Sequence, residues 1–279
     1  MTRLVGVTGS TGAVGGLVAR DLAARGIAQR LVVRDASRAP QLDRAEVATA
    51  SYRDGGSMRA ALDGVDVLLL VSASESADRM TEHATAVRAA AEAGVRHVVY
   101  TSFLGAAADC TFTLGRDHWA TEGLVRDSGM AFTFLRDSLY LDFLPLMAGE
   151  DGVIRGPAGD GRLGAVARED VARVATAALL DPEAHAGRTY DLTGPESLSF
   201  NEIAATISEV TEREVTFHDE AVEEAYASRA PYEAPDWQLD AWVSTYTAVR
   251  AGELDLVTDD VRLVTGRAPV SLRELLSRR

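Results

Sequence analysis

Short apolar runs alternate with longer segments of helical periodicity through the first half of the chain. Continuous apolar runs of this length are typical of parallel strands that are buried on both faces. The expected strands cover residues 4–8, 30–33, 47–50, 65–71, 96–101 and 131–135, and the expected helices cover 12–25, 57–62, 78–93 and 117–127. Strands that alternate with helices in this way predict a Rossmann-type, doubly wound parallel sheet.

The pattern changes after residue 137. Glycines and Pro157 interrupt short strand-like pieces between residues 152 and 164. A helix is then expected over 169–180, a strand over 189–192, a helix over 200–210, and another around Trp237 and Trp242. We therefore expect a large α/β domain over residues 1–150, with its sheet completed by parts of 151–195, and a smaller α/β subdomain over 151–279.

A glycine-rich segment joins the first expected strand to the first expected helix: Thr8-Gly9-Ser10-Thr11-Gly12-Ala13-Val14-Gly15. Here Gly9 permits a tight turn, Gly12 lets the backbone approach a pyrophosphate, and Gly15 allows close packing of the helix on the sheet. The phosphates would lie at a helix amino terminus, where free N–H groups and the helix dipole favour negative charge. The segment therefore predicts dinucleotide binding rather than a merely structural turn.

The residue that ends the second strand distinguishes the two nicotinamide dinucleotides. An acid there accepts from the free ribose 2′-hydroxyl, whereas an arginine pairs with the 2′-phosphate of NADP. The run Leu31-Val32-Val33 ends at Arg34, with Arg38 a turn later, which favours NADPH. Asp35 keeps NADH possible, because it could bind the hydroxyl if the strand ended one residue later.

Composition narrows the possible partners. The chain has 28 basic and 42 acidic residues and a formal net charge of −14, which disfavours nucleic acid and anionic membranes. No apolar run approaches the roughly 18 residues needed to span a bilayer, and no signal-peptide pattern opens the chain, so we expect a cytoplasmic protein. Cys110 is the single cysteine, and we expect neither a disulfide framework nor a metal site.

These motifs, in this order, resemble the atypical short-chain dehydrogenase/reductases of the NmrA-like group, and within it the type 2 NAD(P)H:quinone oxidoreductases. The resemblance covers nearly the whole chain. It rests on residues 9–15, 33–34, 71–74, 99–102, 118–122, 135–137 and 156–161. It implies an NAD(P)-binding Rossmann domain over 1–150 and a substrate-binding subdomain over 151–279.

The resemblance also assigns roles to individual positions. It implies that Arg34 binds the 2′-phosphate, and that Ser72 and Ala73 bind the ribose nearer the nicotinamide. The remaining cofactor contacts are expected at the pyrophosphate, from Gly9, Ser10, Thr11, Gly12, Ala13 and Val14, and beside the nicotinamide, from Thr101, Ser102 and Asp137.

The chain departs from its expected relatives at the proton-transfer residues. Mainstream short-chain dehydrogenases use a Tyr-x-x-x-Lys pair, in which the lysine lowers the pKa of the tyrosine. All 28 basic residues here are arginine, so this pair is impossible. The quinone reductase-like pattern commonly has a lysine after Thr-Glu, where this chain has Gly123, and Asp137 stands where an asparagine is frequent.

A quinone places a smaller demand on proton transfer than a ketone does. Hydride addition to a quinone gives a delocalised phenolate, so binding and alignment could suffice. His118 is a candidate weak acid, which Glu122 would orient from the same helical face, and Tyr140 is a second candidate catalytic residue. Together with Phe103, these two residues are also the expected substrate contacts, because open α/β sheets bind ligands at their carboxyl edge.

Other positions are expected to be structural. We interpret one apolar stripe of the expected helix over 78–93 as core: Met80, Ala84, Val87 and Ala91. Four histidines have no metal-ligand spacing and are expected to be structural or solvated: His83, His97, His185 and His218.

The sequence thus predicts an NADPH-dependent reductase that uses neither flavin nor metal and transfers hydride to a quinone or related conjugated carbonyl. We expect a small aromatic or quinone-like substrate and a monomer or homodimer. Two alternatives stay open. One is a natural-product tailoring enzyme that reduces an aromatic polyketide quinone, whose hydroquinone then reacts with oxygen to give net hydroxylation. The other is an NmrA-like NAD(P)-binding redox sensor without catalysis.

Overall fold

The computed structural model describes residues 3–278, which form two compact units. The first unit comprises the chain up to Ser102, Trp119–Arg136 and Val171–Tyr190. The second comprises Phe103–His118, Asp137–Asp170 and the chain from Asp191 onward. The units therefore alternate along the chain, whereas the sequence suggested one division at residue 150.

The main sheet has seven strands in the order β3-β2-β1-β4-β5-β6-β9. Their bounds are β1 (Val5–Thr8), β2 (Gln29–Val33), β3 (Ala45–Thr49), β4 (Val67–Leu70), β5 (His97–Phe103), β6 (Ala131–Asp137) and β9 (Arg188–Leu192). The strands from β3 to β5 pair in parallel. The strand order reverses between β1 and β4, which is the switch point where such sheets bind ligands. The predicted doubly wound fold is confirmed, and β9 shows that the segment 151–195 completes the sheet.

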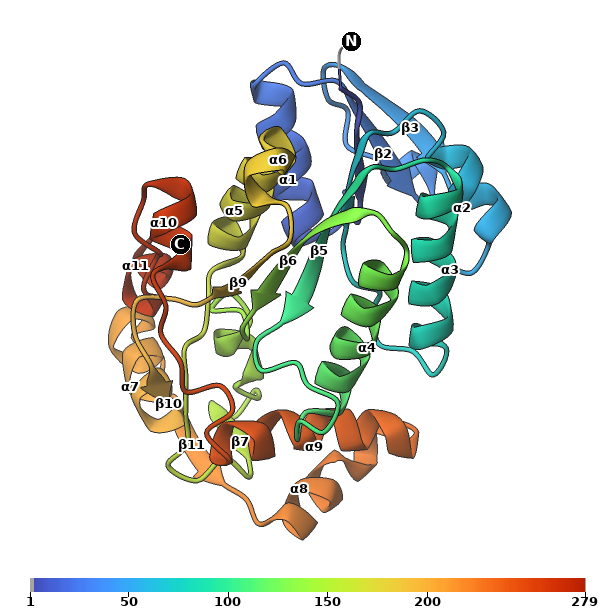
Figure 1. Cartoon of the computed structure of the whole chain (residues 1–279). Helices are drawn as coiled ribbons and strands as arrows, with labels where there is room; N and C mark the ends of the chain where they lie inside the picture. The colour runs from blue at the N-terminus through green and yellow to red at the C-terminus, as the bar shows by residue number, and fades with distance from the viewer. Residues whose placement is uncertain (1–2, 279) are drawn as a thin grey trace. The chain divides into compact units, whose positions relative to one another are not determined.

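Helices cover both faces of this sheet (Figure 1). One face carries α2 (Gly55–Ala61), α3 (Arg79–Glu92) and the part of α4 (Thr113–Asp127) from Trp119 onward, and the other carries α1 (Ala13–Ala24), α5 (Arg168–Leu180) from Val171 onward, and α6 (Pro182–His185). The short helix η1 (Ala36–Arg38) follows β2. Buried side chains such as Tyr100, Phe134 and Met58 form the core beneath α2 and α3. Burial of this apolar surface is the main stabilising contribution to the unit.

The buried face of α3 differs from the expected stripe. The structure buries Arg79, His83, Ala86, Val87 and Ala90, so the face is rotated and two of its members are polar. Polar residues are buried when they find hydrogen-bond partners, as His83 does below. Of the expected apolar stripe, Val87 lies in the core and Ala91 packs against it, whereas Met80 and Ala84 are half-buried.

The second unit is built from small sheets and helices. Strand β7 (Val153–Gly156) pairs in parallel with β11 (Thr216–Asp219), and β8 (Arg162–Leu163) pairs antiparallel with β10 (Leu198–Ser199). The helices are η2 (Leu144–Met147), α7 (Phe200–Thr211), α8 (Val222–Arg229), η3 (Ala230–Tyr232), α9 (Asp236–Arg250), α10 (Asp260–Thr265) and α11 (Leu272–Ser277).

Close packing in this unit requires glycine at position 156, in the predicted glycine-rich stretch. A Cβ added at Gly156 would lie 2.2 Å from the ring of Tyr246, which belongs to α9. The ring itself packs against Phe200 in a tilted arrangement, with 5.2 Å between ring centroids. Any side chain at Gly156 would displace this aromatic core.

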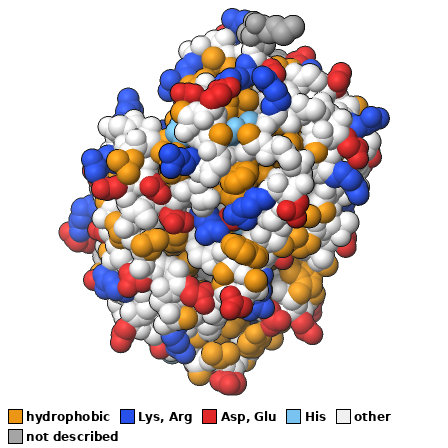
Figure 2. Space-filling model, in the orientation of Figure 1, with side chains coloured by type: hydrophobic (Ala, Val, Ile, Leu, Met, Phe, Trp, Pro, Cys, Tyr) orange, Lys and Arg blue, Asp and Glu red, His pale blue; other side chains and the backbone are white. Residues whose placement is uncertain are grey.

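The visible surface mixes both signs of charge. Figure 2 shows acidic and basic side chains interspersed, with apolar side chains scattered between them. Within residues 3–278, none of the helices combines the length and apolar character that crossing a bilayer requires.

Candidate active site

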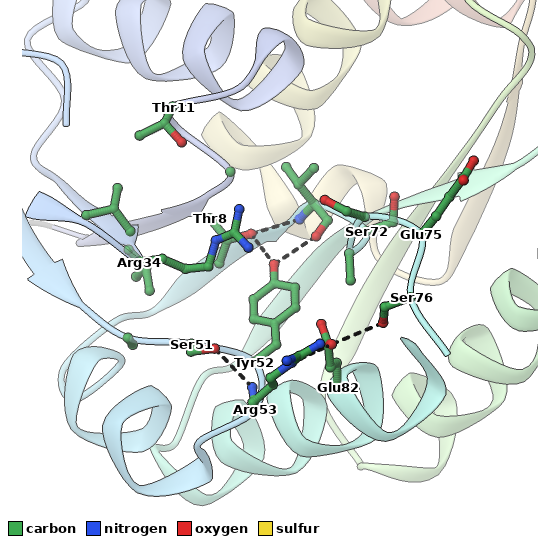
Figure 3. A pocket seen from close by; sticks show the side chains of 17 residues that line it. Thr8, Thr11, Arg34, Ser51, Tyr52, Arg53, Ser72, Glu75, Ser76 and Glu82 are labelled. Carbon is green, nitrogen blue, oxygen red and sulfur yellow. Dashed lines mark hydrogen bonds and ion pairs between the residues drawn. The ribbon is translucent and has the colours of Figure 1, made fainter. Parts of the chain in front are cut away.

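A cavity of about 450 Å³ opens at the carboxyl edge of the sheet in the first unit (Figure 3). It lies where β1 and β4 end, at the switch point of the strand order. Its walls come from the glycine loop, the ends of β2 and β3, the loop after β4 and helix α3. This size is within the ordinary range for small-molecule sites.

The glycine loop has the backbone geometry that the sequence predicts. Gly9 adopts a left-handed φ of 63°, and the amide of Gly12 donates to its carbonyl oxygen at 2.8 Å. A Cβ on Gly15 would lie 2.5 Å from that same oxygen, so the helix packs too closely for any side chain. The hydroxyl of Ser10 is 2% exposed and makes no hydrogen bond within residues 3–278. An unpaired buried hydroxyl beside a helix amino terminus fits a phosphate ligand.

Arg34 and Asp35 follow the end of β2 and have different surroundings. Arg34 lines the cavity and makes no ion pair with any described residue. Asp35 is exposed, and its carboxylate accepts from the amide and the hydroxyl of Ser37 at 2.9 and 2.7 Å. These hydrogen bonds lower the pKa of Asp35 and commit it to capping η1. The end of β2 therefore presents a cation to the cavity.

Tyr52 connects three segments of the cavity wall. Its hydroxyl lies 2.6 Å from Thr8 Oγ1 and 2.8 Å from the carbonyl oxygen of Val71, while the Val71 amide donates to Thr8 Oγ1 at 2.9 Å. Burial raises the pKa of the Tyr52 phenol, which therefore stays protonated and able to donate. The loops after β1, β3 and β4 are thus held together at the cavity.

Arg53 is the second arginine of the cavity, but it already has a partner. Its Nε donates to the carboxylate of Glu82 at 2.9 Å, and the hydroxyl of Ser76 donates to the same oxygen at 3.1 Å (Figure 3). Glu82 thereby links the loop after β3 to the loop after β4. Arg34 is therefore the cavity cation without an intramolecular partner among the described residues.

His83 is hydrogen-bonded to the loop after β4. The amide of Ala73 donates to His83 Nε2 at 2.9 Å, so Nε2 carries no proton and Nδ1 donates to Thr121 Oγ1 at 2.7 Å. The ring is 1% exposed, and burial lowers the pKa of His83 to about 3. The amide of Ser72 donates to Thr101 Oγ1 at 2.8 Å. Both expected ribose contacts are therefore held at their backbone amides.

Glu122 is a fully buried carboxylate with three partners. It accepts from Ser102 Oγ at 2.6 Å, from Arg136 through Nε and Nη2 at 2.8 Å each, and from Arg126 at 2.9 Å. Two guanidinium groups neutralise it, as a buried charge requires. Its oxygens thus bind Ser102 and the two arginines, contacts that the sequence interpretation did not include.

The second unit holds the expected substrate-side residues. His118 is buried, with its ring centroid 6.0 Å from that of Phe103. The hydroxyl of Tyr140 donates to Asp137 Oδ2 at 2.6 Å, and the Arg168 guanidinium lies 4.9 Å from the centre of the Tyr140 ring. Burial raises the pKa of Asp137 to about 8. Within residues 3–278, no group of three histidine, cysteine, aspartate or glutamate side chains is arranged to hold a metal ion.

The structure gathers many of the expected cofactor contacts around one cavity. Gly9, Thr11, Arg34, Ser72 and Ala73 line it. The remaining loop residues, Ser10, Gly12, Ala13 and Val14, lie in the glycine loop and the first turn of α1. Two other expected contacts have partners within the protein, since Thr101 accepts from the Ser72 amide and Ser102 donates to Glu122.

The cavity residues that sequence reasoning missed include Ser51, Tyr52 and Arg53 after β3, and Glu82 on α3. The first three could have been found, because the carboxyl end of every strand in a parallel sheet faces the same edge. Nothing in the local sequence indicated the roles of Glu82 and His83, which depend on contacts between distant segments.

Comparisons with known proteins agree with this geometry. A family model described as the NmrA-like family matches residues 1–238. The NAD(P)H azoreductase of Xenophilus azovorans is 33% identical over 94% of this chain and 92% of its own length. Quinone oxidoreductase 2 of Escherichia coli K12 is 30% identical over 98% of each chain. The crystal structure of an E. coli NADPH-dependent quinone oxidoreductase complexed with NADPH superposes with a TM-score of 0.88, at 28% identity, over 98% of this chain and 99% of that one.

Proposed function

The chain belongs to the NmrA-like family, and on that premise we propose that it is an NADPH-dependent, flavin-independent reductase of quinones or related conjugated carbonyls. It is an NAD(P)H-dependent oxidoreductase, in keeping with the named reductases that match it along nearly its whole length. The observation that carries the choice of NADPH is Arg34, a cation without an ion-pair partner among the described residues, in a cavity beside a dinucleotide-type glycine loop.

The residues around the cavity fit this cofactor. The Ser10 hydroxyl and the amino end of α1 would bind the pyrophosphate, and Arg34 would bind the 2′-phosphate. When bound, NADPH supplies a hydride from C4 of its nicotinamide. The Ser72–Ala73 segment, fixed by Thr101 and His83, would hold the nicotinamide-side ribose in place.

The protein's own contribution to the reaction is chiefly alignment. Hydride transfer to a quinone forms a delocalised phenolate, so the barrier depends less on a strong acid than in ketone reduction. Glu122 is neutralised by Arg126 and Arg136 and would keep Ser102 in one rotamer at the end of β5. Tyr140 and His118 are the proposed substrate-side groups, and Phe103 would contribute an apolar surface.

The test is NADPH oxidation by the purified protein, measured with and without quinone and without added flavin. We expect oxidation to depend on the quinone and to proceed with no bound flavin in the absorption spectrum. An azo dye and an unactivated ketone serve as comparison acceptors. If NADPH binds but no acceptor is reduced, the redox-sensor reading replaces this proposal.

One further outcome identifies the tailoring reading. An aromatic polyketide quinone is then the substrate, and its hydroquinone reacts with oxygen. Oxygen consumption that matches NADPH oxidation, with labelled oxygen retained in the product, would establish net hydroxylation. Reduction that proceeds equally well without oxygen, and gives hydroquinone alone, supports the simpler quinone reductase.

A further inference from the structure

The structure places a carboxyl group and a phenol in direct contact where β6 ends. Asp137 is the last residue of β6, at the carboxyl edge of the sheet, and its backbone carbonyl accepts from the Leu104 amide at 2.9 Å. Tyr140 follows three residues later in a segment anchored beside Val166 by a backbone bridge. The 2.6 Å contact between Tyr140 Oη and Asp137 Oδ2 is therefore set by two fixed backbones.

Asp137 has little to stabilise a negative charge. Its side chain is 5% exposed, and in the part of the chain that the structure describes it forms no ion pair. Arg168, whose charge favours the ionised form of Asp137, lies over the ring of Tyr140. Burial therefore dominates and raises the pKa of Asp137 to about 8, so that the carboxyl group keeps its proton at neutral pH.

The Asp137–Tyr140 pair can hold either one or two protons. An ionised Asp137 beside Tyr140 holds one proton, which lies between the two oxygens. A neutral pair holds two protons, and only one of them can occupy the 2.6 Å contact. The second proton is free to be donated to a third group. When the protonated carboxyl group of Asp137 donates to Tyr140 Oη, the phenolic O–H of Tyr140 can donate its proton to the third group.

We propose that Asp137 and Tyr140 act as a two-proton acid, in which Tyr140 protonates the reduced substrate and Asp137 restores the proton to Tyr140. This inference rests on the proposed reductase function and assigns its proton source. An asparagine amide at position 137 could accept from Tyr140 but could not supply a proton. The pair would replace the tyrosine and lysine that this lysine-free chain cannot form.

The proposed step balances without a further reactant. The quinone gains a hydride from NADPH and becomes a hydroquinone monoanion. Its oxygen takes the phenolic proton of Tyr140 while Tyr140 takes the carboxyl proton of Asp137, so the charge ends on the carboxylate. Solvent then returns one proton to Asp137, which is the proton that the overall reaction consumes.

Transfer through the pair avoids a buried phenolate. Burial, followed by the nearby Asp137, raises the pKa of Tyr140 well above its usual value, so Tyr140 alone would be a poor acid. With Asp137 as its proton donor, Tyr140 never carries the charge. The other charged groups that act on the pair are Arg168, which favours the ionised forms, and Asp142, whose charge opposes ionisation of Tyr140.

The first test measures the proton itself. In an infrared difference titration of the wild-type protein, we expect a protonated-carboxyl C=O band at pH 7 that disappears with a midpoint near pH 8. Asp137→Asn should remove this band. Asp142→Asn is the matched control and should keep it, because Asp142 accepts from the Arg168 amide at 2.9 Å and not from Tyr140. Absence of the band from the wild type, or its persistence in Asp137→Asn, would overturn the proposal.

The second test measures whether the reaction uses the proton of Asp137. The single-turnover rate of quinone reduction in the wild type should fall about tenfold between pH 7 and pH 9, in proportion to the protonated fraction of a group with a pKa near 8. Asp137→Asn should be slower at pH 7 and nearly independent of pH over this interval. An Asp137→Asn protein that keeps the wild-type profile would refute the role of Asp137 as proton source.

The two tests separate this inference from the proposed function. If the wild type reduces no quinone at any pH, the proposed function fails, while the infrared titration still decides whether Asp137 holds the proton. Circular dichroism and NADPH titration of each variant establish that it is folded and binds cofactor. Tyr140→Phe should keep the carboxyl band, because Asp137 stays buried, yet lose the pH-dependent part of the rate.

Discussion

Arg34 lines the cavity and has no ion-pair partner within residues 3–278. Replacing it with alanine therefore tests a contact with the cofactor without breaking an ion pair inside the protein. Because Arg34 makes no ion pair there, its loss should leave the free energy of unfolding within the small range typical of surface substitutions, about 0.5 kcal/mol. The effect should instead appear in cofactor binding. A charge-assisted hydrogen bond is worth about 1.5–3 kcal/mol, so the Kd for NADPH should rise about 10- to 150-fold.

The structure supplies a matched control for this change. Arg38 lies four residues later, in η1, where it is exposed and does not line the cavity. Arg38→Ala removes the same charge from the same part of the chain and should change the Kd for NADPH by less than about threefold, as expected for a screened, distant charge. NADH lacks the 2′-phosphate, so its Kd should hardly change in either variant.

Calorimetric titration of both nucleotides into wild type, Arg34→Ala and Arg38→Ala provides the assay. The ratio of the two dissociation constants is the decisive quantity, because a general disturbance of the site would weaken both nucleotides alike. An equal loss for NADPH and NADH in Arg34→Ala, or no loss for either, would remove Arg34 from the 2′-phosphate site. A loss in Arg38→Ala as large as in Arg34→Ala would show that only overall charge matters.

Three further predictions follow from the same geometry. Gly12→Val should fold, since its Cβ meets only the Gly9 carbonyl oxygen, at 3.2 Å, but it should lose NADPH binding in a titration; unchanged affinity would mean that the pyrophosphate lies elsewhere. The lowered pKa of His83, about 3 against an ordinary 6.5, means that folding keeps the ring neutral and that its stabilising contribution is lost as the pH falls below 6.5. Denaturant melts at pH 7 and pH 4.5 should therefore show the stability gap between wild type and His83→Gln shrinking by about 2–3 kcal/mol, and a constant gap would contradict the neutral ring. His118→Ala should lower the rate of quinone reduction by less than about 10²-fold, because a loss of 10²–10⁴-fold would mark an essential general acid and point to less activated carbonyls as substrates.

Local sequence patterns were sufficient for the backbone geometry of the glycine loop and for the place of Arg34 beside the cavity. Gly9 and Gly15 are needed for backbone reasons that any doubly wound fold imposes on its first turn, and the structure shows both the left-handed turn and the close packing. Arg34 follows from its place at the end of β2. Its competitor Asp35 could be set aside only in the structure, because the capping contact with Ser37 depends on how the chain turns after the strand.

Contacts between distant segments were beyond the reach of these patterns. The burial of His83 depends on the Ala73 amide and Thr121, which lie 10 and 38 residues away. The buried face of that helix therefore includes polar positions that the expected apolar stripe left out. The expectation that Glu122 orients His118 came from their place on one helical face, and that pattern gave no sign that Arg136 on β6 binds the Glu122 carboxylate. Periodicity describes one element at a time and gives no information about which polar group a neighbouring element offers.

The alternation of the chain between two units could not be predicted for the same reason. Apolar runs located the strands, but they could not show that residues 103–118 and 137–170 leave the unit that holds the preceding strand. Membership of a unit depends on which surfaces pack together, and those contacts join residues far apart in the sequence.

We propose that the protein passes a hydride from NADPH directly to a quinone without flavin. Anaerobic single-turnover reduction of a quinone by flavin-free protein, with NADPH deuterated at the transferring C4 position, tests it most directly. We predict that NADPH oxidation and hydroquinone formation occur at one common rate and that deuterium slows both equally. A reaction that begins only after flavin is added, or hydroquinone that appears at a rate unaffected by the deuterium, would rule out direct hydride transfer.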